Sequence, residues 1–503
     1  RRERERERET MSSLLSKLQL RFPDLFEAAF ASPEDTAHLQ QQLLELPEDT
    51  VEIVEEVLHK YLHGLGEESV TLDPVPETVK FEEDPIPNLD SVSWKGGMQR
   101  IAEGKFACIV MAGGQGTRLG SKDPKGMFDV GLPSGKSLLE IQAQRLLTLQ
   151  RLARQLFPNE RSHPCVIPWY LMCSDSTETP TREFLEKHDF FGLDRSNIVF
   201  FSQGSMPCVS LEGELLLAGP HELALSPDGN GGIFRALRKT GCIDDMRARG
   251  VEAVHCHCVD NVLVRPCDPW FMFECHSRQV DAGAAVVPKA YPEEPVGVFA
   301  VRNGVIGVVE YSEFSKERAS ETTESGELRF NLANIAVHYF SVPFLEKCEE
   351  WMEHSRRYHV AKKAIPHFDT KTGTMVEPCT PNGIKMEQFI FDVFEIAESF
   401  LAMEFPRSTI FSPLKNAEAS SSRDNARTCR EALDQLHRRW ATACGVSVPE
   451  GGLLEFCPLL TYAGESLPPL LPPGHTLPPQ FYPDADSIRR HLRPLTAHEG
   501  NPQ

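Results

Sequence analysis

The chain has 503 residues, of which 41% are hydrophobic, and it carries a formal net charge of −21 at pH 7. This length allows roughly two to four domains with a sizeable buried core, and no apolar stretch approaches the roughly twenty residues that span a membrane. The acidic field argues against nucleic acid or an anionic membrane surface as a partner, yet it leaves room for a small anion in a locally basic pocket.

The first hundred residues predict helices and a linker. Residues 1–10, "RRERERERET", alternate in charge sign and predict a solvated tail or an artefact upstream of Met11. Apolar residues at three-to-four spacing predict helices between Ser12 and Gly64, and a proline-rich connector follows at 72–90. We therefore assign 11–100 to an N-terminal helical region and its linker.

The middle of the chain alternates strand-like and helix-like segments. Strands are predicted at 106–112, 167–174, 197–203 and 251–259, and helices at 136–157, 179–192 and 232–241. Strands separated by helices imply crossover connections, which predict an α/β fold with a Rossmann-like, doubly wound, mostly parallel sheet. Such sheets bind ligands beyond the carboxyl ends of their strands.

Two later segments complete the outline of the fold. Two strand-like runs surround Asn303-Gly304 within 296–310 and predict a β-hairpin, which we expect to cover the site. After about Pro413 the composition becomes polar and then rich in proline at 466–480, which predicts a small C-terminal region, 418–503, with loose segments.

The fourteen cysteines are scattered without a paired framework. They predict reduced thiols and a cytoplasmic location. The densest cluster is "HCHC" at 255–258, where alternation along a strand would point Cys256 and Cys258 one way and His255 and His257 the other. We favour a buried strand over a metal site there.

One loop concentrates glycine and positive charge. "MAGGQGTRLGSKDPKGM", residues 111–127, holds five glycines, an arginine and two lysines directly after a predicted strand. It fails the dinucleotide pattern G-x-G-x-x-G because the third position is Leu119, and "GLPSGKS" at 131–137 is one residue too short for a P-loop. What remains is a turn whose amides can approach a phosphate chain, with Arg118 and Lys125 able to neutralise it.

The string "GGQGTRLGSKDPKGM" resembles the signature of the sugar-nucleotide pyrophosphorylases, and this version is most similar to the eukaryotic UDP-N-acetylglucosamine (UDP-N-acetylhexosamine) pyrophosphorylase family. The resemblance continues in the family's order through "FFGL", "SPDGNGG", "CVDN", "EPVGV", "VVEYSE", "FNLANIA", "PNGIKMEQFIFD" and "FSPLKNA". It covers roughly 106–417, with a weaker echo at 458–467, and implies a catalytic nucleotidyltransferase domain at 101–417.

The resemblance implies that UTP and N-acetylglucosamine 1-phosphate react to give UDP-N-acetylglucosamine and pyrophosphate. The sugar phosphate oxygen is already ionised, so in-line attack on the α-phosphorus needs no general base and no covalent nucleophile. Two polyanions must approach each other, which requires local positive charge and usually Mg²⁺. The implied partners are UTP and an N-acetylhexosamine 1-phosphate, and we expect a monomer or homodimer.

The resemblance also implies roles for individual residues. Phosphate-binding and catalytic roles fall to Arg118, Lys125 and Lys385, the sugar phosphate to Lys415, and the metal to Asp260, which also lies at the nucleotide. Nucleotide binding extends to the backbone of Met111, Ala112, Gly113 and Gly114, to the Gln203 amide, whose donor and acceptor match a uracil edge, and to Gly229. Sugar contacts fall to Asn230, Glu310, Tyr311 and Asn334, because carboxylate and amide groups suit hydroxyls and an acetamido group.

The chain departs from the family pattern at a few positions. Met111 replaces a usual leucine, Gly135 replaces a frequent basic residue, and Leu332, Val337 and Tyr339 differ from the common residues around Asn334. These departures leave two alternatives open beside the N-acetylglucosamine enzyme. One is a UDP-glucose or broad UDP-sugar pyrophosphorylase, and the other is a non-catalytic nucleotide-sugar-binding protein, against which the retained basic residues and Asp260 argue.

Overall fold

The computed structural model describes residues 16–23, 25, 37–46, 49–63, 71–76, 78–81, 86–158, 165–355 and 357–495. They belong to two compact units, each built from three stretches of the chain. The larger unit comprises Thr71–Ser202, Leu237–Cys348 and Phe394–Gln503, and the smaller comprises Arg1–Val70, Gln203–Ala236 and Glu349–Val393. Over the described ranges, no helix is both long and apolar enough to cross a membrane.

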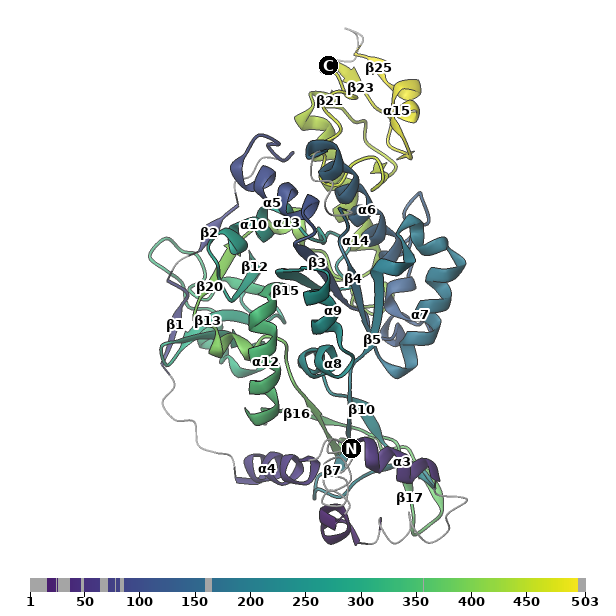
Figure 1. The fold of residues 1–503 in the computed structure, drawn as a ribbon, viewed down its shortest axis with the longest axis vertical. Helices are drawn as coiled ribbons and strands as arrows, with labels where there is room; N and C mark the ends of the chain where they lie inside the picture. The colour runs from purple at the N-terminus through teal and green to yellow at the C-terminus, as the bar shows by residue number, and fades with distance from the viewer. Residues whose placement is uncertain are drawn as a thin grey trace. The chain divides into compact units, whose positions relative to one another are not determined.

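An eleven-stranded sheet forms the centre of the larger unit in the part of the chain that the structure describes (Figure 1). Eight strands follow one another in the order β2, β20, β12, β15, β11, β3, β4, β5. Their bounds are Val79–Lys80, Phe400–Glu404, Ala282–Pro288, Leu332–Ser341, Ala253–Cys258, Phe106–Met111, Trp169–Cys173 and Ile198–Ser202. Only the two pairs made by β15 are antiparallel. The predicted Rossmann-like, mostly parallel sheet is therefore confirmed.

Helices cover both faces of this sheet. All six residues of β3 are buried, as expected for a strand packed on both sides. Cys108 and Trp169 pack in one core with α5 (Val92–Ala102), α6 (Leu138–Leu156) and α10 (Pro269–Ser277). On the opposite face, the Tyr170 hydroxyl donates to Asp245 of α9 (Cys242–Ala248) over 2.7 Å. The remaining helices include α7 (Asp175–Lys187), α8 (Ile233–Lys239), α11 (Lys316–Ala319), α12 (Val342–Ser355) and α13 (Arg407–Ile410).

The predicted hairpin is confirmed. β13 (Val298–Arg302) pairs antiparallel with β14 (Val305–Val309), and β1 (Leu72–Pro74) pairs with the outer side of β13. The turn residues Asn303 and Gly304 have φ of 52° and 84°, which is the left-handed backbone that an Asn-Gly turn supplies. β13 joins the main sheet through its pairing with β15.

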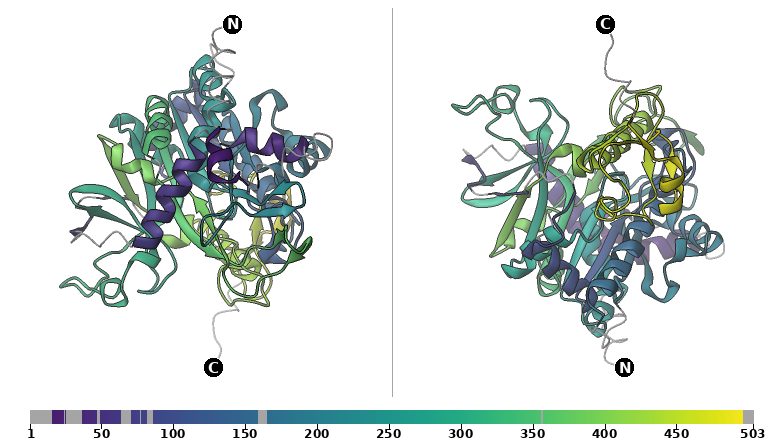
Figure 2. Two further views of the ribbon diagram at one scale, coloured as in Figure 1. Left: turned by 90° about the horizontal axis from the view of Figure 1, so that it is seen from below. Right: turned by 90° about the horizontal axis from the view of Figure 1, so that it is seen from above.

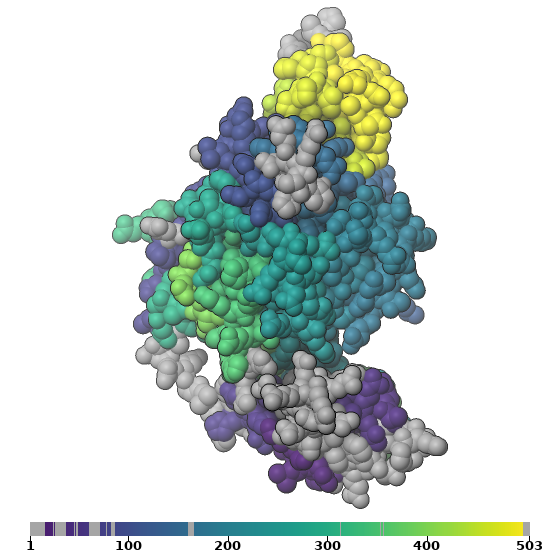
Figure 3. All heavy atoms as spheres, viewed as in Figure 1, coloured from purple at the N-terminus to yellow at the C-terminus, as the bar shows by residue number. Residues whose placement is uncertain are grey.

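The C-terminal region is packed, so the prediction of loose segments was wrong. Its elements are α14 (Ala426–Ala443), α15 (Ala485–His491) and the short strands β21 (Val446–Ser447), β22 (Glu455–Phe456), β23 (His475–Thr476), β24 (Phe481–Tyr482) and β25 (Arg493–Pro494). They are yellow to yellow-green in Figures 1 and 2, and the yellow part of the chain forms one continuous surface region in Figure 3. Within the proline-rich stretch, Leu467, Leu471 and Leu477 are fully buried in the core that contains Trp440. The prolines reduce the conformational freedom of the unfolded chain, and the leucines between them supply buried apolar surface in the folded chain.

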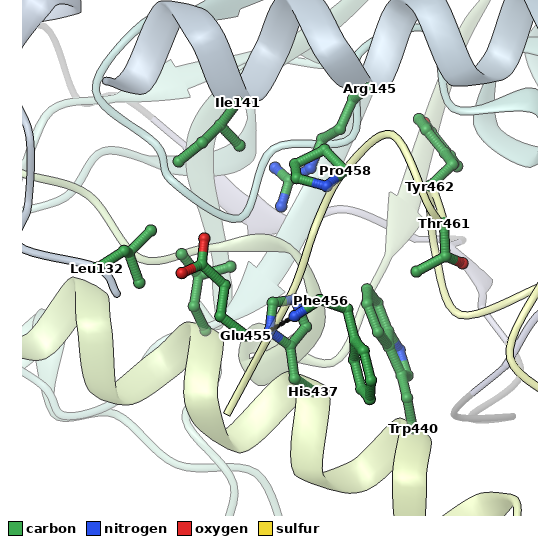
Figure 4. Close-up of a pocket in the computed structure, with 11 residues that line it drawn as sticks. Leu132, Ile141, Arg145, His437, Trp440, Glu455, Phe456, Pro458, Thr461 and Tyr462 are labelled. Atoms are coloured by element: carbon green, nitrogen blue, oxygen red, sulfur yellow. Dashed lines mark hydrogen bonds between the residues drawn. The ribbon is translucent and has the colours of Figure 1, made fainter. Parts of the chain in front are cut away.

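This region is fastened to α6 by buried polar contacts. Figure 4 shows a small cavity between α6 and α14, with Arg145 on one wall and His437 on the other. The Arg145 guanidinium donates to the carbonyls of Val262 and Val264 over 2.9 and 2.6 Å, and burial lowers its pKa to about 10. The buried Thr148 hydroxyl of α6 donates to the carbonyl of Pro458 over 2.8 Å. This contact fixes the chain that follows α14 on the core of the larger unit.

The smaller unit joins N-terminal helices to short antiparallel strands. Leu39 of α3 (Ala37–Glu45) and Val54 of α4 (Thr50–His63) share one core with Val209 and Met386. The strands pair as β7–β19–β16, β6–β10, β8–β9 and β17–β18. Their bounds are Val209–Ser210, Gly383–Glu387, His359–Lys363, Ser205–Pro207, Leu225–Pro227, Leu217–Gly219, Glu222–Leu223, His367–Asp369 and Thr374–Val376.

The N-terminal prediction of helices is confirmed where the structure describes them, and the tail predicted at 1–10 lies outside the described residues. The four-part division, with boundaries after residues 10, 100 and 417, does not coincide with the two units. As a statement about separately folding domains it stays a prediction.

Candidate functional site

The glycine-rich loop folds back on itself after β3. The N–H of Gly116 donates to the carbonyl of Asp123 over 3.0 Å, and that of Lys125 donates to Gly114 over 3.1 Å. Gly116 is needed for this fold, since an added Cβ would lie 2.8 Å from the Asp123 carbonyl oxygen. Gly114 serves another purpose, because a Cβ there would meet no atom within 4 Å. The open side of the loop at Gly114 therefore allows close approach of a ligand.

The start of the loop offers backbone donors. The Gly113 carbonyl accepts from the Ser174 hydroxyl over 3.0 Å, and the N–H of Ala112 donates to Met172 over 2.8 Å. The N–H groups of Gly113 and Gly114 donate to no other residue within the described ranges. Met111 and Ala112 are buried, and the carbonyl of Met111 accepts from the N–H of Val259 over 3.2 Å. Two neighbouring free amides at a strand end suit an anion or a carbonyl acceptor.

The loop places Lys125 beside the end of β11, the strand that pairs with β3. Its ammonium lies 3.2 Å from Oδ2 of Asp260, which follows β11, and the two side chains are each 19% exposed. Oδ1 of Asp260 accepts no hydrogen bond from a described residue. Arg118, in contrast, is exposed on the same loop and forms no ion pair with the residues that the structure describes.

Asn261 joins the end of β11 to the segment around Ser412, which is distant in the sequence. Its buried amide donates to the carbonyl of Ile410 over 2.7 Å, and its Oδ1 accepts from the N–H of Ser412 over 3.0 Å. Leu414 then donates its N–H to the Asp260 carbonyl over 2.9 Å. "FSPLKNA" is thus tied to the end of β11, which places the half-buried Lys415 beside it.

The pKa of the Cys258 thiol shows which charged groups lie near the end of β11. The pKa of this thiol is raised to about 12, mainly by desolvation and then by the charge of Asp260, while the charges of Lys125 and Lys415 oppose the shift. The two lysines and the acid therefore surround the end of β11. Of the predicted phosphate, metal and sugar-phosphate residues, the structure brings Lys125, Asp260 and Lys415 together at the carboxyl edge of the parallel strands in the larger unit.

Two predicted sugar contacts also meet in the larger unit, around Gly297. Its carbonyl accepts from the N–H of Asn334 over 2.8 Å. A Cβ at Gly297 would lie 2.8 Å from Oε1 of Glu310, so the Glu310 carboxylate rests against this glycine. Tyr311 follows on the η6 turn and is 53% exposed.

Four predicted site residues lie in the smaller unit. Gly229 has φ of 88°, and a Cβ there would lie 2.3 Å from the Gln388 carbonyl oxygen, so only glycine fits. Oδ1 of Asn230 accepts from the N–H of Ile390 over 3.0 Å. Gln203 precedes Gly204, whose carbonyl accepts from the N–H of Asp228 over 3.1 Å. Lys385 lies on β19, just before the segment that clamps Gly229.

Asp228 is a buried acid among these segments. It is 1% exposed, and its carboxylate packs against the α-carbons of Gly204 and Gly232. Burial raises its pKa to about 7, and the charge of Arg235 opposes that shift. Its Oδ1 has no hydrogen-bond partner among the described residues.

The "HCHC" strand and Cys108 form a buried cluster of three potential metal ligands. Nδ1 of His257 lies 3.3 Å from Nδ1 of His255 and 3.9 Å from Sγ of Cys108. Burial lowers the pKa of His255 to about 3, and the charge of Arg265 adds to this effect. Burial also raises the pKa of the Cys108 thiol, although a metal ligand must be a thiolate. A cation here would face nearby arginine charge, so the buried strand is the better interpretation.

The P-loop-like turn at 131–137 binds a carboxylate side chain of the protein itself. The N–H and hydroxyl of Ser134 donate to the carboxylate of Glu455 over 2.9 and 2.6 Å. Lys136 pairs with Glu140 one helical turn later. This turn therefore attaches the C-terminal region and is not a phosphate site.

Sequence reasoning missed Asn261, Gly297 and Asp228 as residues of the site. Each lies inside a motif already noted, "CVDN", "EPVGV" or "SPDGNGG". Their partners include Ile410, Glu310 and Gly204, which lie 149, 13 and 24 positions away, and no local pattern encodes these contacts.

Known proteins share this fold and sequence. The family model described as UTP–glucose-1-phosphate uridylyltransferase matches residues 56–426. UDP-N-acetylhexosamine pyrophosphorylase-like protein 1 of Xenopus tropicalis is 45% identical over 389 residues, covering 74% of this chain and 75% of the relative. UDP-N-acetylglucosamine diphosphorylase 2 of Arabidopsis thaliana is 40% identical over 448 residues, covering 87% of this chain and 86% of the relative.

A solved structure supports the same grouping. The crystal structure of the uridine diphosphate N-acetylglucosamine pyrophosphorylase from Trypanosoma brucei, in complex with inhibitor, superposes with a TM-score of 0.76 at 26% identity. The match covers 92% of this chain and 94% of that one. The chain therefore belongs to the UDP-N-acetylhexosamine pyrophosphorylases of the UTP–glucose-1-phosphate uridylyltransferase family.

Proposed function

We propose that this chain transfers the uridylyl group of UTP to N-acetylglucosamine 1-phosphate, which yields UDP-N-acetylglucosamine and pyrophosphate. The observation that carries the proposal is the meeting of Lys125, Asp260 and Lys415 at one strand end, beside a loop with free backbone amides. The names of the relatives, which are N-acetylglucosamine and N-acetylhexosamine pyrophosphorylases, support the choice of substrate.

The reaction needs positioning and charge compensation more than proton transfer. An oxygen of the sugar phosphate attacks the α-phosphorus in line, and the bond to the bridging oxygen of pyrophosphate breaks. Lys125 and Arg118 neutralise the triphosphate and the departing pyrophosphate, while Lys415 orients the attacking phosphate. Lys385, which lies on β19, is the further cation that the family resemblance assigns to the nucleotide phosphates.

Magnesium is the proposed cofactor, and Asp260 is its proposed protein ligand. Mg²⁺ commonly binds one or two carboxylates and completes its shell with water and substrate phosphates. The Asp260 carboxylate fits that requirement, since its only described side-chain partner is Lys125 and its Oδ1 is unused. When bound, the ion would supply positive charge that lowers the mutual repulsion of the two phosphate-bearing substrates.

The remaining predicted residues select the two substrates. The backbone of Met111 to Gly114, the Gln203 amide and Gly229 bind the uridine part of UTP. Asn230, Glu310, Tyr311 and Asn334 bind the sugar. In support, Oδ1 of Asn230 is engaged by Ile390, so its amide nitrogen remains to donate to a sugar oxygen.

The proposed setting is the cytoplasm. All fourteen cysteines are free thiols, and all but Cys258 and Cys379 are buried, which suits a reducing compartment. Monomer or homodimer stays a prediction.

The test is a comparison of sugar phosphates. The purified chain is incubated with UTP, Mg²⁺ and one sugar 1-phosphate at a time, and released pyrophosphate is measured. We expect the highest kcat/KM with N-acetylglucosamine 1-phosphate. Equal or faster turnover with glucose 1-phosphate would replace the proposal by a UDP-glucose or broad UDP-sugar enzyme, and no release with any sugar would indicate a non-catalytic protein.

A further inference from the structure

An irregularity in β15 places two side chains in contact. β12 pairs Ala285 with Val337 but its next residue, Val286, with Asn334, so Ile335 and Ala336 have no partner on β12. Residues four apart in a regular strand are separated by about 13 Å. Here Nε2 of His338 lies only 3.1 Å from Oδ1 of Asn334.

The hydrogen bonds fix the orientation of the Asn334 amide. The N–H of Ala336 lies 3.0 Å from Oδ1 of Asn334, and because a backbone N–H can only donate, this atom must be the oxygen. His338 must then also donate, so its proton sits on Nε2. Burial lowers the pKa of His338 to about 3, which keeps the ring neutral. The amide nitrogen of Asn334 has no partner among the described residues, so it remains available as a donor.

This amide lies among the proposed sugar contacts of the larger unit. The N–H of Asn334 donates to Gly297, and Gly297 packs against the Glu310 carboxylate. Because Oδ1 of Asn334 already accepts two hydrogen bonds, the amide nitrogen is the side-chain group left for a ligand, and it can only donate.

Packing alone does not explain the histidine or the backbone. His338 is fully buried, and its Nδ1 has no hydrogen-bond partner among the described residues, although its ring packs edge-on against Phe394. A phenylalanine would fill this place without burying an unpaired nitrogen. Ala336 adds a cost, because its φ of 53° is unfavourable for a residue with a side chain. Costs of this kind are typical of functional sites.

We propose that His338 is a positioning residue for sugar selection, which holds Asn334 Oδ1 so that the amide nitrogen faces the substrate and selects a hydrogen-bond acceptor on the sugar. The acetamido carbonyl of an N-acetylhexosamine is such an acceptor. This inference rests on the proposed function and adds to it a residue outside the sugar contacts themselves.

The test compares sugar selection in His338 variants. The readout is the ratio of kcat/KM for N-acetylglucosamine 1-phosphate to that for glucose 1-phosphate, which does not depend on the fraction of folded enzyme. We expect His338→Phe to lower this ratio about tenfold with little change in the KM for UTP, and His338→Gln, which can donate from a similar position, to restore most of it. His255→Phe is the matched control, a buried neutral histidine on the other face of the sheet that should alter stability only.

A double-mutant cycle shows whether His338 acts through Asn334. If it does, His338→Phe has no further effect on the ratio in an Asn334→Ala background. An unchanged ratio in His338→Phe, additive effects in the cycle, or an equal effect of His255→Phe would each overturn the inference while leaving the proposed function intact. A wild-type chain that releases no pyrophosphate with either sugar would overturn both.

Discussion

The ammonium of Lys125 and the carboxylate of Asp260 lie 3.2 Å apart, although they are 135 residues apart in the chain. Each follows one of two adjacent parallel strands, β3 and β11, so the sheet brings them to the same edge. The pair compensates a part-buried positive charge until anionic substrates arrive. In the proposed function, Lys125 then binds phosphate and Asp260 binds Mg²⁺.

Lys125→Ala should abolish most of the turnover. Loss of a cation that stabilises the departing pyrophosphate is expected to lower kcat at least a hundredfold, or about 3 kcal/mol of transition-state stabilisation. Pyrophosphate release under saturating UTP and sugar phosphate gives the measurement. Lys122→Ala removes an exposed cation from the same loop and should leave kcat nearly unchanged. Comparable losses in both variants would mean that the loop's total charge matters and not the position of Lys125.

Asp260→Asn should weaken the response to magnesium. An amide binds Mg²⁺ less well than a carboxylate, so the Mg²⁺ concentration for half-maximal rate should rise at least about tenfold. A titration of initial rate against Mg²⁺ checks this. Asp123→Asn changes an exposed acid of the glycine-rich loop and serves as the control. A magnesium curve that stays at its wild-type position in Asp260→Asn would remove Asp260 from the metal site.

The sequence predicted much of the larger unit's sheet because those signals are local. β3, α6 and β11 were evident from apolar runs and helical spacing, and the hairpin from Asn303-Gly304. The packing of the C-terminal region was not evident, because the leucines among its prolines are buried by α14, which is distant in the chain.

The same distinction applies to the site. The end of β11 predicted where Asp260 would lie, since ligands gather at the carboxyl edge of such sheets. The roles of Asn261 and His338 could not be predicted, because they depend on a loop 149 residues away and on an irregularity in strand pairing. Periodicity reports which face a residue occupies, but not which backbone groups it meets there.

Asp228→Asn should change how stability depends on pH. The pKa of Asp228 is raised by burial from 3.8 to about 7, so the folded chain binds this proton more tightly than the unfolded chain. Its contribution to stability is therefore fully present below about pH 4 and is lost as the pH rises towards 7. The neutral asparagine lacks this dependence, so the variant should gain stability relative to wild type between those values, by on the order of 4 kcal/mol at most.

Urea unfolding followed at several pH values between 4 and 8 measures this difference. Glu377→Gln, which removes an exposed carboxylate from the same unit, should follow the wild-type pH dependence. Parallel pH profiles for Asp228→Asn and wild type would show that Asp228 stays ionised in the folded chain.

Glu455→Ala should detach the C-terminal region from the turn at 131–137. The variant loses two hydrogen bonds from Ser134 to a buried carboxylate and leaves those donors without their partner, which should cost about 2 kcal/mol. Thermal unfolding should show a lower midpoint. Activity should fall less than in Lys125→Ala, because the turn lies outside the proposed phosphate contacts. Glu450→Ala, at an exposed position nearby, should leave the midpoint unchanged. If Glu455→Ala unfolds like wild type but loses activity as completely as Lys125→Ala, the turn at 131–137 belongs to the catalytic machinery after all.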